Sequence, residues 1–162
     1  MTHDQLFIKM AIDSWNGQVT ATSKLLDQLS DEQLQEQVAP GKNRGIYLLG
    51  HLVSVHDKML SLLLLGEELY PELYPVFVQS PDGAVAGLPV TIAQLRQQWT
   101  QVNAKLAEQF AQLSAEDWFG RHANISAEDW AKEPHRNRLN VLLSRTNHLS
   151  NHRGQLALLV KK

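Results

Sequence analysis

"TIAQLRQQWTQVNAKLAEQFAQL", residues 91–113, carries the clearest structural pattern in the chain. Its apolar residues recur at steps of three and four, which places them along one stripe of an α-helix. Thr91 followed by Gln94 is the capping-box arrangement that begins a helix. The stretch therefore predicts a long amphipathic helix that buries one face. That face consists of Ile92, Leu95, Trp99, Val102, Leu106, Phe110 and Leu113.

Three further segments show the same periodicity, at about 4–29, 46–65 and 139–160. Ser30 with Gln33 predicts a short capped helix after the first of them. No segment shows the alternation of a strand. Four amphipathic helices of similar length bury their apolar stripes around one core, so we expect an all-α four-helix bundle. The 162 residues suit a single domain over 1–162.

Two stretches interrupt the helical pattern. Residues 67–90 hold four prolines, and a connection of this length is typical of a functional loop or a crossover between distant ends of helices. The pentapeptide SAEDW occurs at 114–118 and again at 126–130. We interpret each copy as a helix-start cap followed by an aromatic anchor, since repeat arrays need several units.

Composition and charge exclude several classes of function. The chain is 43% hydrophobic and 20% charged, and its net charge of −2 gives no basis for binding nucleic acid. The absence of cysteine excludes disulfides, thiolate ligands and a cysteine nucleophile. "MLSLLLLG", at 59–66, is shorter than the roughly 20 apolar residues of a membrane span. The first residues do not form a signal peptide pattern. We expect a cytoplasmic protein without nucleic-acid or membrane partners.

The stretch "NHLSNHRGQL", at 147–156, holds His148 and His152 four positions apart. On a helix, this spacing makes the two side chains neighbours, here beside the row of Leu142, Leu149 and Leu156. A buried imidazole without a partner costs about 1–3 kcal/mol. A divalent metal ion satisfies both rings at once. Hydrogen bonds to neighbours or to water are the alternative.

A third histidine, His51, lies within the apolar seam of the second long helix. It meets the other two if the second and fourth helices are neighbours. Gly50 and Gly154, each near a candidate ligand, would let the two backbones approach closely. Three nitrogen ligands leave one coordination position for water or substrate, as in catalytic zinc sites. The predicted metal ligands are His51, His148 and His152.

The remaining histidines receive weaker roles. His56 is five residues after His51 and points away from it, so we expect it at the surface or behind the ligands.

Three imidazoles suit zinc, nickel, copper or iron. Because a protonated imidazole cannot bind a metal, we expect release of the ion below about pH 6.

The motifs "GHLVSVHD" at 50–57 and "HLSNHRGQL" at 148–156 resemble those of the DinB-like superfamily. That superfamily includes bacterial thiol S-transferases of the bacillithiol and mycothiol type, and the resemblance covers essentially the whole chain. It implies an antiparallel bundle with up-down-down-up topology, in which 67–90 is the crossover between the second and third long helices. It also implies a homodimer and a zinc or nickel ion, held here by His51, His148 and His152.

Two classes of function follow from these residues. In the first, the metal lowers the pKa of a coordinated thiol or water. A low-molecular-weight thiol as co-substrate makes the protein a thiol S-transferase that acts on a small molecule, whereas water makes it a hydrolase of amides or esters. Gln155 and Arg145 are candidate supporting residues. Arg145 either holds a substrate carboxylate or is an exposed surface residue.

The second class is a non-catalytic, metal-binding helical module that mediates dimerisation. Aromatic side chains would supply its contact surface, or would instead cover the ends of the bundle. These side chains are Tyr70, Tyr74, Phe77, Trp118 and Trp130.

Overall fold

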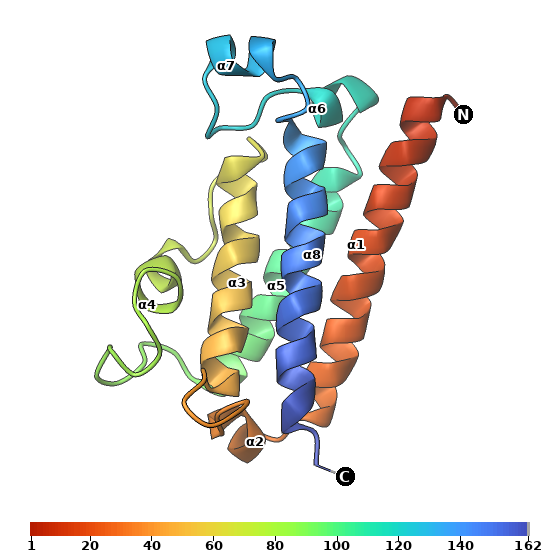
Figure 1. Cartoon of the computed structure of the whole chain (residues 1–162). Coiled ribbons are helices and arrows are strands. Elements are labelled where there is room, and N and C mark those ends of the chain that lie inside the picture. Colours follow the sequence, from red (N-terminus) through yellow and green to blue (C-terminus); the bar gives the residue numbers. More distant parts are fainter. Residues whose placement is uncertain (162) are drawn as a thin grey trace.

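The computed structural model describes residues 1–161, and every regular element within them is helical (Figure 1). The prediction of an all-α protein is therefore confirmed. Among these residues, no helix combines the length and the apolar character needed to cross a membrane. The long helices are α1 (His3–Gln28), α3 (Gly45–Leu62), α5 (Ile92–Phe110) and α8 (Arg138–Leu156). The short ones are α2 (Asp31–Gln35), α4 (Tyr74–Phe77), α6 (Ala115–Phe119) and α7 (Ala127–Lys132), with 3-10 turns η1 (Pro71–Leu73) and η2 (Ala157–Leu159).

Side-chain caps fix where most of these helices begin. Thr91 and Gln94 form the predicted capping box at the start of α5, and Ser30 and Gln33 form the one at α2. Each such cap stabilises a helix by about 1 kcal/mol. Both SAEDW copies also begin capped helices, α6 at Ser114 and α7 at Ser126. The interpretation of the two copies as helix starts is confirmed.

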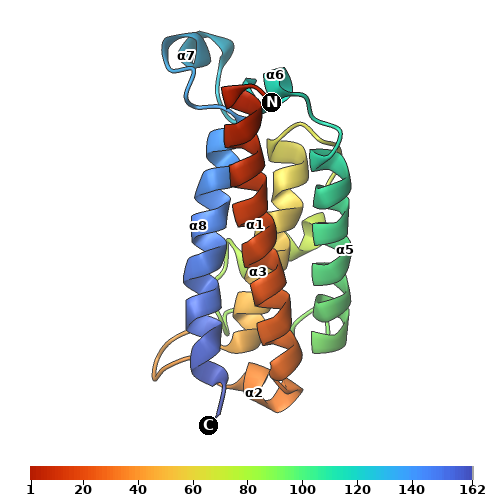
Figure 2. The ribbon, with the colours of Figure 1, turned by 90° about the vertical axis from the view of Figure 1, so that its right-hand side faces the viewer.

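The four long helices lie side by side, with α1 against α8 and α3 against both α5 and α8 (Figures 1 and 2). Figure 1 shows α1 and α8 running in one direction and α3 and α5 running in the other. The short helix α2 lies near one end of the long helices, and α6 and α7 lie near the other. Helix α3 is enclosed by its neighbours, because α4 lies against it as well.

The apolar stripe of α5 is buried from Ile92 to Phe110, as its periodicity predicts, and Leu113 just beyond the helix is partly buried. The sequence predicts a helix to about residue 160 with Val160 in its apolar seam, and the end of α8 differs from this prediction. The helix ends at Leu156 and continues as the tighter turn η2, so Leu159 is buried while Val160 is 41% exposed. A 3-10 turn has three residues per turn, and this change of period moves the buried position by one residue.

The segment between α3 and α5 has more helical structure than its prolines suggest, because it contains η1 and α4. Its start is fixed by Asp57 of α3, whose carboxylate accepts hydrogen bonds from the backbone N–H groups of Leu69 and Tyr70 at 2.7 and 2.8 Å. Farther along, Asp82 forms an ion pair with Arg44 at 2.6 Å, just before α3 begins. Residues 69–70 and Asp82 are therefore held at opposite ends of α3.

The aromatic residues divide between core and partly exposed positions. Phe77 and Trp118 are buried, and Trp118 packs against Phe110 with ring centroids 5.1 Å apart. Tyr70, Tyr74 and Trp130 are only partly buried. Trp118 thus covers the end of the helical core, which is the second of the two roles predicted for these side chains.

Candidate metal centre

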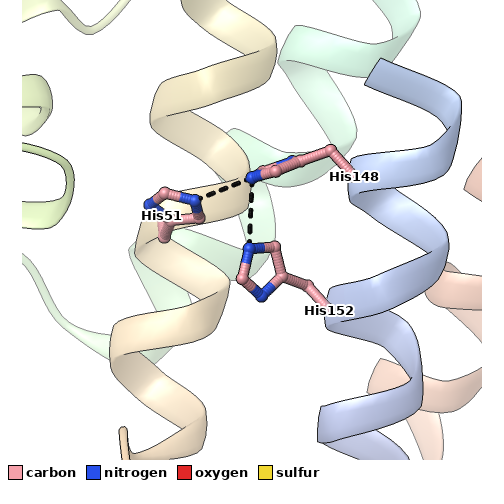
Figure 3. Close-up of side chains that lie close together, drawn as sticks. All are labelled: His51, His148 and His152. Carbon is pink, nitrogen blue, oxygen red and sulfur yellow. Dashed lines mark hydrogen bonds between the residues drawn. The ribbon is translucent and has the colours of Figure 1, made fainter. Parts of the chain in front are cut away.

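Three imidazole rings meet between α3 and α8 (Figure 3). His51 comes from α3, and His148 and His152 come from successive turns of α8. Nε2 of His148 lies 3.1 Å from Nε2 of His51 and 3.1 Å from Nε2 of His152. The convergence of these three rings, predicted from helical periodicity, is therefore present. Their assignment as metal ligands stays a prediction.

The outer nitrogens of two of the rings have fixed partners. Nδ1 of His51 lies 2.8 Å from the backbone oxygen of Phe77, and Nδ1 of His152 lies 2.7 Å from Oε1 of Gln155. A carbonyl oxygen only accepts hydrogen bonds, so each Nδ1 carries the proton and each Nε2 keeps a lone pair. Both lone pairs face Nε2 of His148. Without a shared cation or proton, this arrangement is repulsive.

The spacing of the nitrogens fits a divalent metal ion. Metal–nitrogen bonds of about 2.0–2.1 Å place two ligands about 3.4 Å apart at a tetrahedral angle and about 2.9 Å apart at a right angle. The two separations from Nε2 of His148, both 3.1 Å, lie between these values, and all three ligand atoms lie within 4.8 Å of one another. No carboxylate belongs to the cluster among residues 1–161, so its donors are three imidazoles. This donor set suits zinc, nickel and other borderline-soft cations.

The site also favours unprotonated imidazoles, which metal binding requires. Burial lowers the pKa of His148 to about 3, and the positive charges of the neighbouring imidazoles and of Arg145 add to the effect. Burial lowers the pKa of His51 as well, against the opposing hydrogen bond to Phe77. All three residues are nevertheless partly exposed.

Nδ1 of His148 is the one outer nitrogen of the cluster that lacks a partner among the described residues, although it is buried. Histidines that bind metals usually donate this N–H to a carboxylate, a carbonyl or a water molecule. The cluster is therefore supported from two sides, by Phe77 and Gln155, and left unsupported on the third.

Gly50 makes a close contact, but with a different helix from the one predicted. A Cβ atom at Gly50 would lie 2.4 Å from Cδ1 of Phe77, so the glycine lets the ring of Phe77 lie directly against α3. At Gly154, no heavy atom comes within 4 Å of such a Cβ. The prediction that both glycines bring α3 and α8 together is wrong, because imidazole side chains are long enough to span the gap.

His56 is buried rather than at the surface, which corrects the prediction for this residue. Its ring lies between those of Trp15 and Trp99, with centroids 4.7 and 4.9 Å away, and its Nδ1 is 2.8 Å from Oδ1 of Asn103. Burial lowers its pKa to about 4. Because α3 is central, the face that points away from α8 is covered by α1 and α5.

Arg145 is half-buried, not a freely exposed arginine. Burial is the largest cause of the lowered pKa values of His51, His56 and His148, and the positive charge of Arg145 lowers each of them further. Its guanidinium therefore lies within electrostatic range of the histidine cluster. Gln155, the other candidate supporting residue, orients His152 directly.

Comparison with known families identifies the class of protein. The model of the DinB superfamily matches residues 16–156. The chain therefore belongs to the DinB superfamily, which confirms the resemblance seen in its two histidine motifs. The comparison with curated proteins found no match.

Proposed function

We propose that this member of the DinB superfamily is a metal-dependent thiol S-transferase, with His51, His148 and His152 as the ligands of a zinc or nickel ion. The observation that carries the proposal is the convergence of three Nε2 atoms, two of which have their lone pairs directed inward. Three protein ligands leave room for a reacting group at the metal. The partial exposure of the rings supports access by a small molecule.

A divalent cation held by the three histidines would lower the pKa of a thiol or water that it coordinated. The chain's contribution is orientation: the oxygens of Phe77 and Gln155 hold the Nδ1 protons and thereby aim the Nε2 lone pairs. In the transfer, the sulfur of a low-molecular-weight thiol forms a bond to an electrophilic carbon. The leaving group departs with the electron pair of the broken bond, and the thiol proton passes to solvent.

The proposal includes two further features implied by the resemblance. The first is an up-down-down-up four-helix bundle over 1–162, which the directions of the long helices in Figure 1 support. The second is a homodimer, which light scattering on the purified protein tests directly.

Metal analysis tests the ligand assignment. We expect about one divalent ion per wild-type chain and a large loss in His148→Ala, because removing one of three ligands leaves only two. His135→Ala is the matched control, since His135 is exposed in the segment before α8. Equal metal content in wild type and His148→Ala would contradict the assignment.

A conjugation assay tests the reaction. Metal-loaded protein is incubated with a low-molecular-weight thiol and a chlorinated electrophile, and ester and amide hydrolysis is measured in parallel. Conjugation that is lost in His148→Ala supports the transferase. Hydrolysis without conjugation would make water the nucleophile. No turnover by fully loaded protein would favour the non-catalytic module.

A further inference from the structure

Arg145 occupies an unusual position for a charged residue. It precedes His148 by three residues on α8, which places the two side chains on neighbouring positions of one helix face, about 4.5 Å apart along the axis. Its Nε is buried without a hydrogen-bond partner, and the residue forms no ion pair within residues 1–161. A buried N–H donor without a partner is costly, so this arrangement favours a bound hydrogen-bond acceptor, and an anion pairs best with a guanidinium.

The charges around the histidine cluster also favour the binding of an anion. Among the described residues, the cluster holds three imidazoles and no carboxylate, so no anionic side chain in it balances the guanidinium of Arg145. A divalent ion would add two positive charges to that of the guanidinium. A site with this excess attracts negatively charged ligands and concentrates them.

We propose that Arg145 binds a carboxylate of the substrate or co-substrate whose other end occupies the open position at the metal. The inference rests on the proposed function, because the metal holds the reacting group. Arginine presents two parallel N–H donors to a carboxylate, which gives both affinity and orientation. The ligand class is a small carboxylic acid whose metal-binding group lies a few carbon atoms from the carboxylate.

A matched pair of thiols tests the inference by binding, without any turnover. The zinc content of each protein is measured first, and 3-mercaptopropionate and 3-mercaptopropan-1-ol are then titrated calorimetrically into the zinc-loaded protein. The two probes differ only in the carboxylate. We expect wild type to bind the carboxylated thiol about 10- to 100-fold more tightly, the range expected for a hydrogen-bonded charge pair.

Three variants separate recognition from general effects. Arg145→Gln is expected to abolish the preference while it leaves the affinity for the neutral thiol within about twofold. Arg145→Lys keeps the charge but loses the paired donors, so an intermediate preference is expected. Arg153→Gln is the control, because Arg153 is also half-buried on α8 but bonds to Gln18 at 3.2 Å. It should retain the full preference.

A second pair of probes tests the role of Arg145 independently of the thiol chemistry. Butanehydroxamate and its analogue with a terminal carboxylate bind metals without sulfur. Zinc-loaded protein that binds neither thiol would refute the transferase, while the hydroxamates would still test Arg145. Equal affinities for the carboxylated and neutral members of both pairs would overturn the role of Arg145 and leave the transferase standing. If the wild-type protein binds no zinc, both the transferase proposal and the role of Arg145 are contradicted.

Discussion

The backbone oxygen of Phe77 accepts a 2.8 Å hydrogen bond from Nδ1 of His51, although the two residues are 26 positions apart. Phe77 belongs to α4, in the long segment between α3 and α5, and its ring lies against Gly50, the residue before His51. The segment that joins the second and third long helices therefore also sets the orientation of one imidazole in the candidate metal centre.

Gly50→Ala should disturb this support. The new Cβ would lie 2.4 Å from Cδ1 of Phe77, so the ring must move and the carbonyl that holds His51 moves with it. Loss of such an outer hydrogen bond typically weakens metal binding about 10- to 100-fold. Overpacking should also lower the free energy of unfolding by about 1–3 kcal/mol. Competition with a chelating dye measures the affinity.

Gly154→Ala is the matched control for that substitution. Gly154 is an exposed helical glycine beside the other candidate ligands, and its Cβ would meet no heavy atom within 4 Å. We expect unchanged metal affinity and a gain in stability of up to about 1 kcal/mol from better helix propensity. Equal losses of affinity in both glycine variants would argue against a specific role for Phe77.

Gln155→Ala should weaken metal binding about tenfold, because His152 loses the oxygen that accepts its Nδ1 proton at 2.7 Å. Gln155→Glu keeps an acceptor at the same position and should retain the affinity or raise it. The comparison is made by metal titration of both variants. A loss of equal size in the glutamate variant would show that the side-chain oxygen does not orient the ring.

Acidification should release the metal at a lower pH than the sequence indicates. An ordinary imidazole pKa near 6.5 predicts release below about pH 6, but burial lowers the pKa of His148 to about 3. Protons therefore compete for this nitrogen only in more acidic solution. We expect bound metal to persist at pH 6 and to fall as the protein is dialysed toward pH 3. Complete release already at pH 6 would contradict this expectation.

His56 should make the stability of the protein depend on pH. Burial lowers its pKa from 6.5 to about 4, so between these values the unfolded chain binds a proton that the folded chain does not. The free energy of unfolding should therefore fall as the pH decreases from 6.5 to about 4, with no further loss from this residue below that. The contribution is about 3 kcal/mol.

The test of that contribution is urea unfolding of wild type and His56→Gln across the same range of pH. Glutamine cannot titrate but keeps an amide donor for Asn103. The variant should lose less stability on acidification than wild type does. Parallel pH profiles for the two proteins would show that His56 is not the group that titrates.

The sequence predicts the features that depend on periodicity along one helix. The stripe of α5 and the pairing of His148 with His152 follow from the spacing of residues on a single cylinder. The meeting with His51 required one further assumption, that the second and fourth long helices are neighbours, and the structure bears it out.

Features that depend on which helices enclose a residue were not predicted. His56 was expected at the surface or behind the ligands because it points away from His51, yet Trp15 and Trp99 of two other helices cover it. The role of Phe77 had no signal at all in the sequence. Every residue has a backbone carbonyl, and only the folded chain determines which one reaches an imidazole.

One ring of the centre comes from α3 and two come from α8, so an ion bound there would cross-link these helices. Divalent ions differ in preferred bond length and angle, whereas the apolar packing between the helices resists any change in their separation. The fixed separation of α3 and α8 would then favour ions whose preferred bond lengths fit it and disfavour the others. Substitutions in the hydrophobic core, well away from any histidine, should accordingly retune which cation the protein prefers.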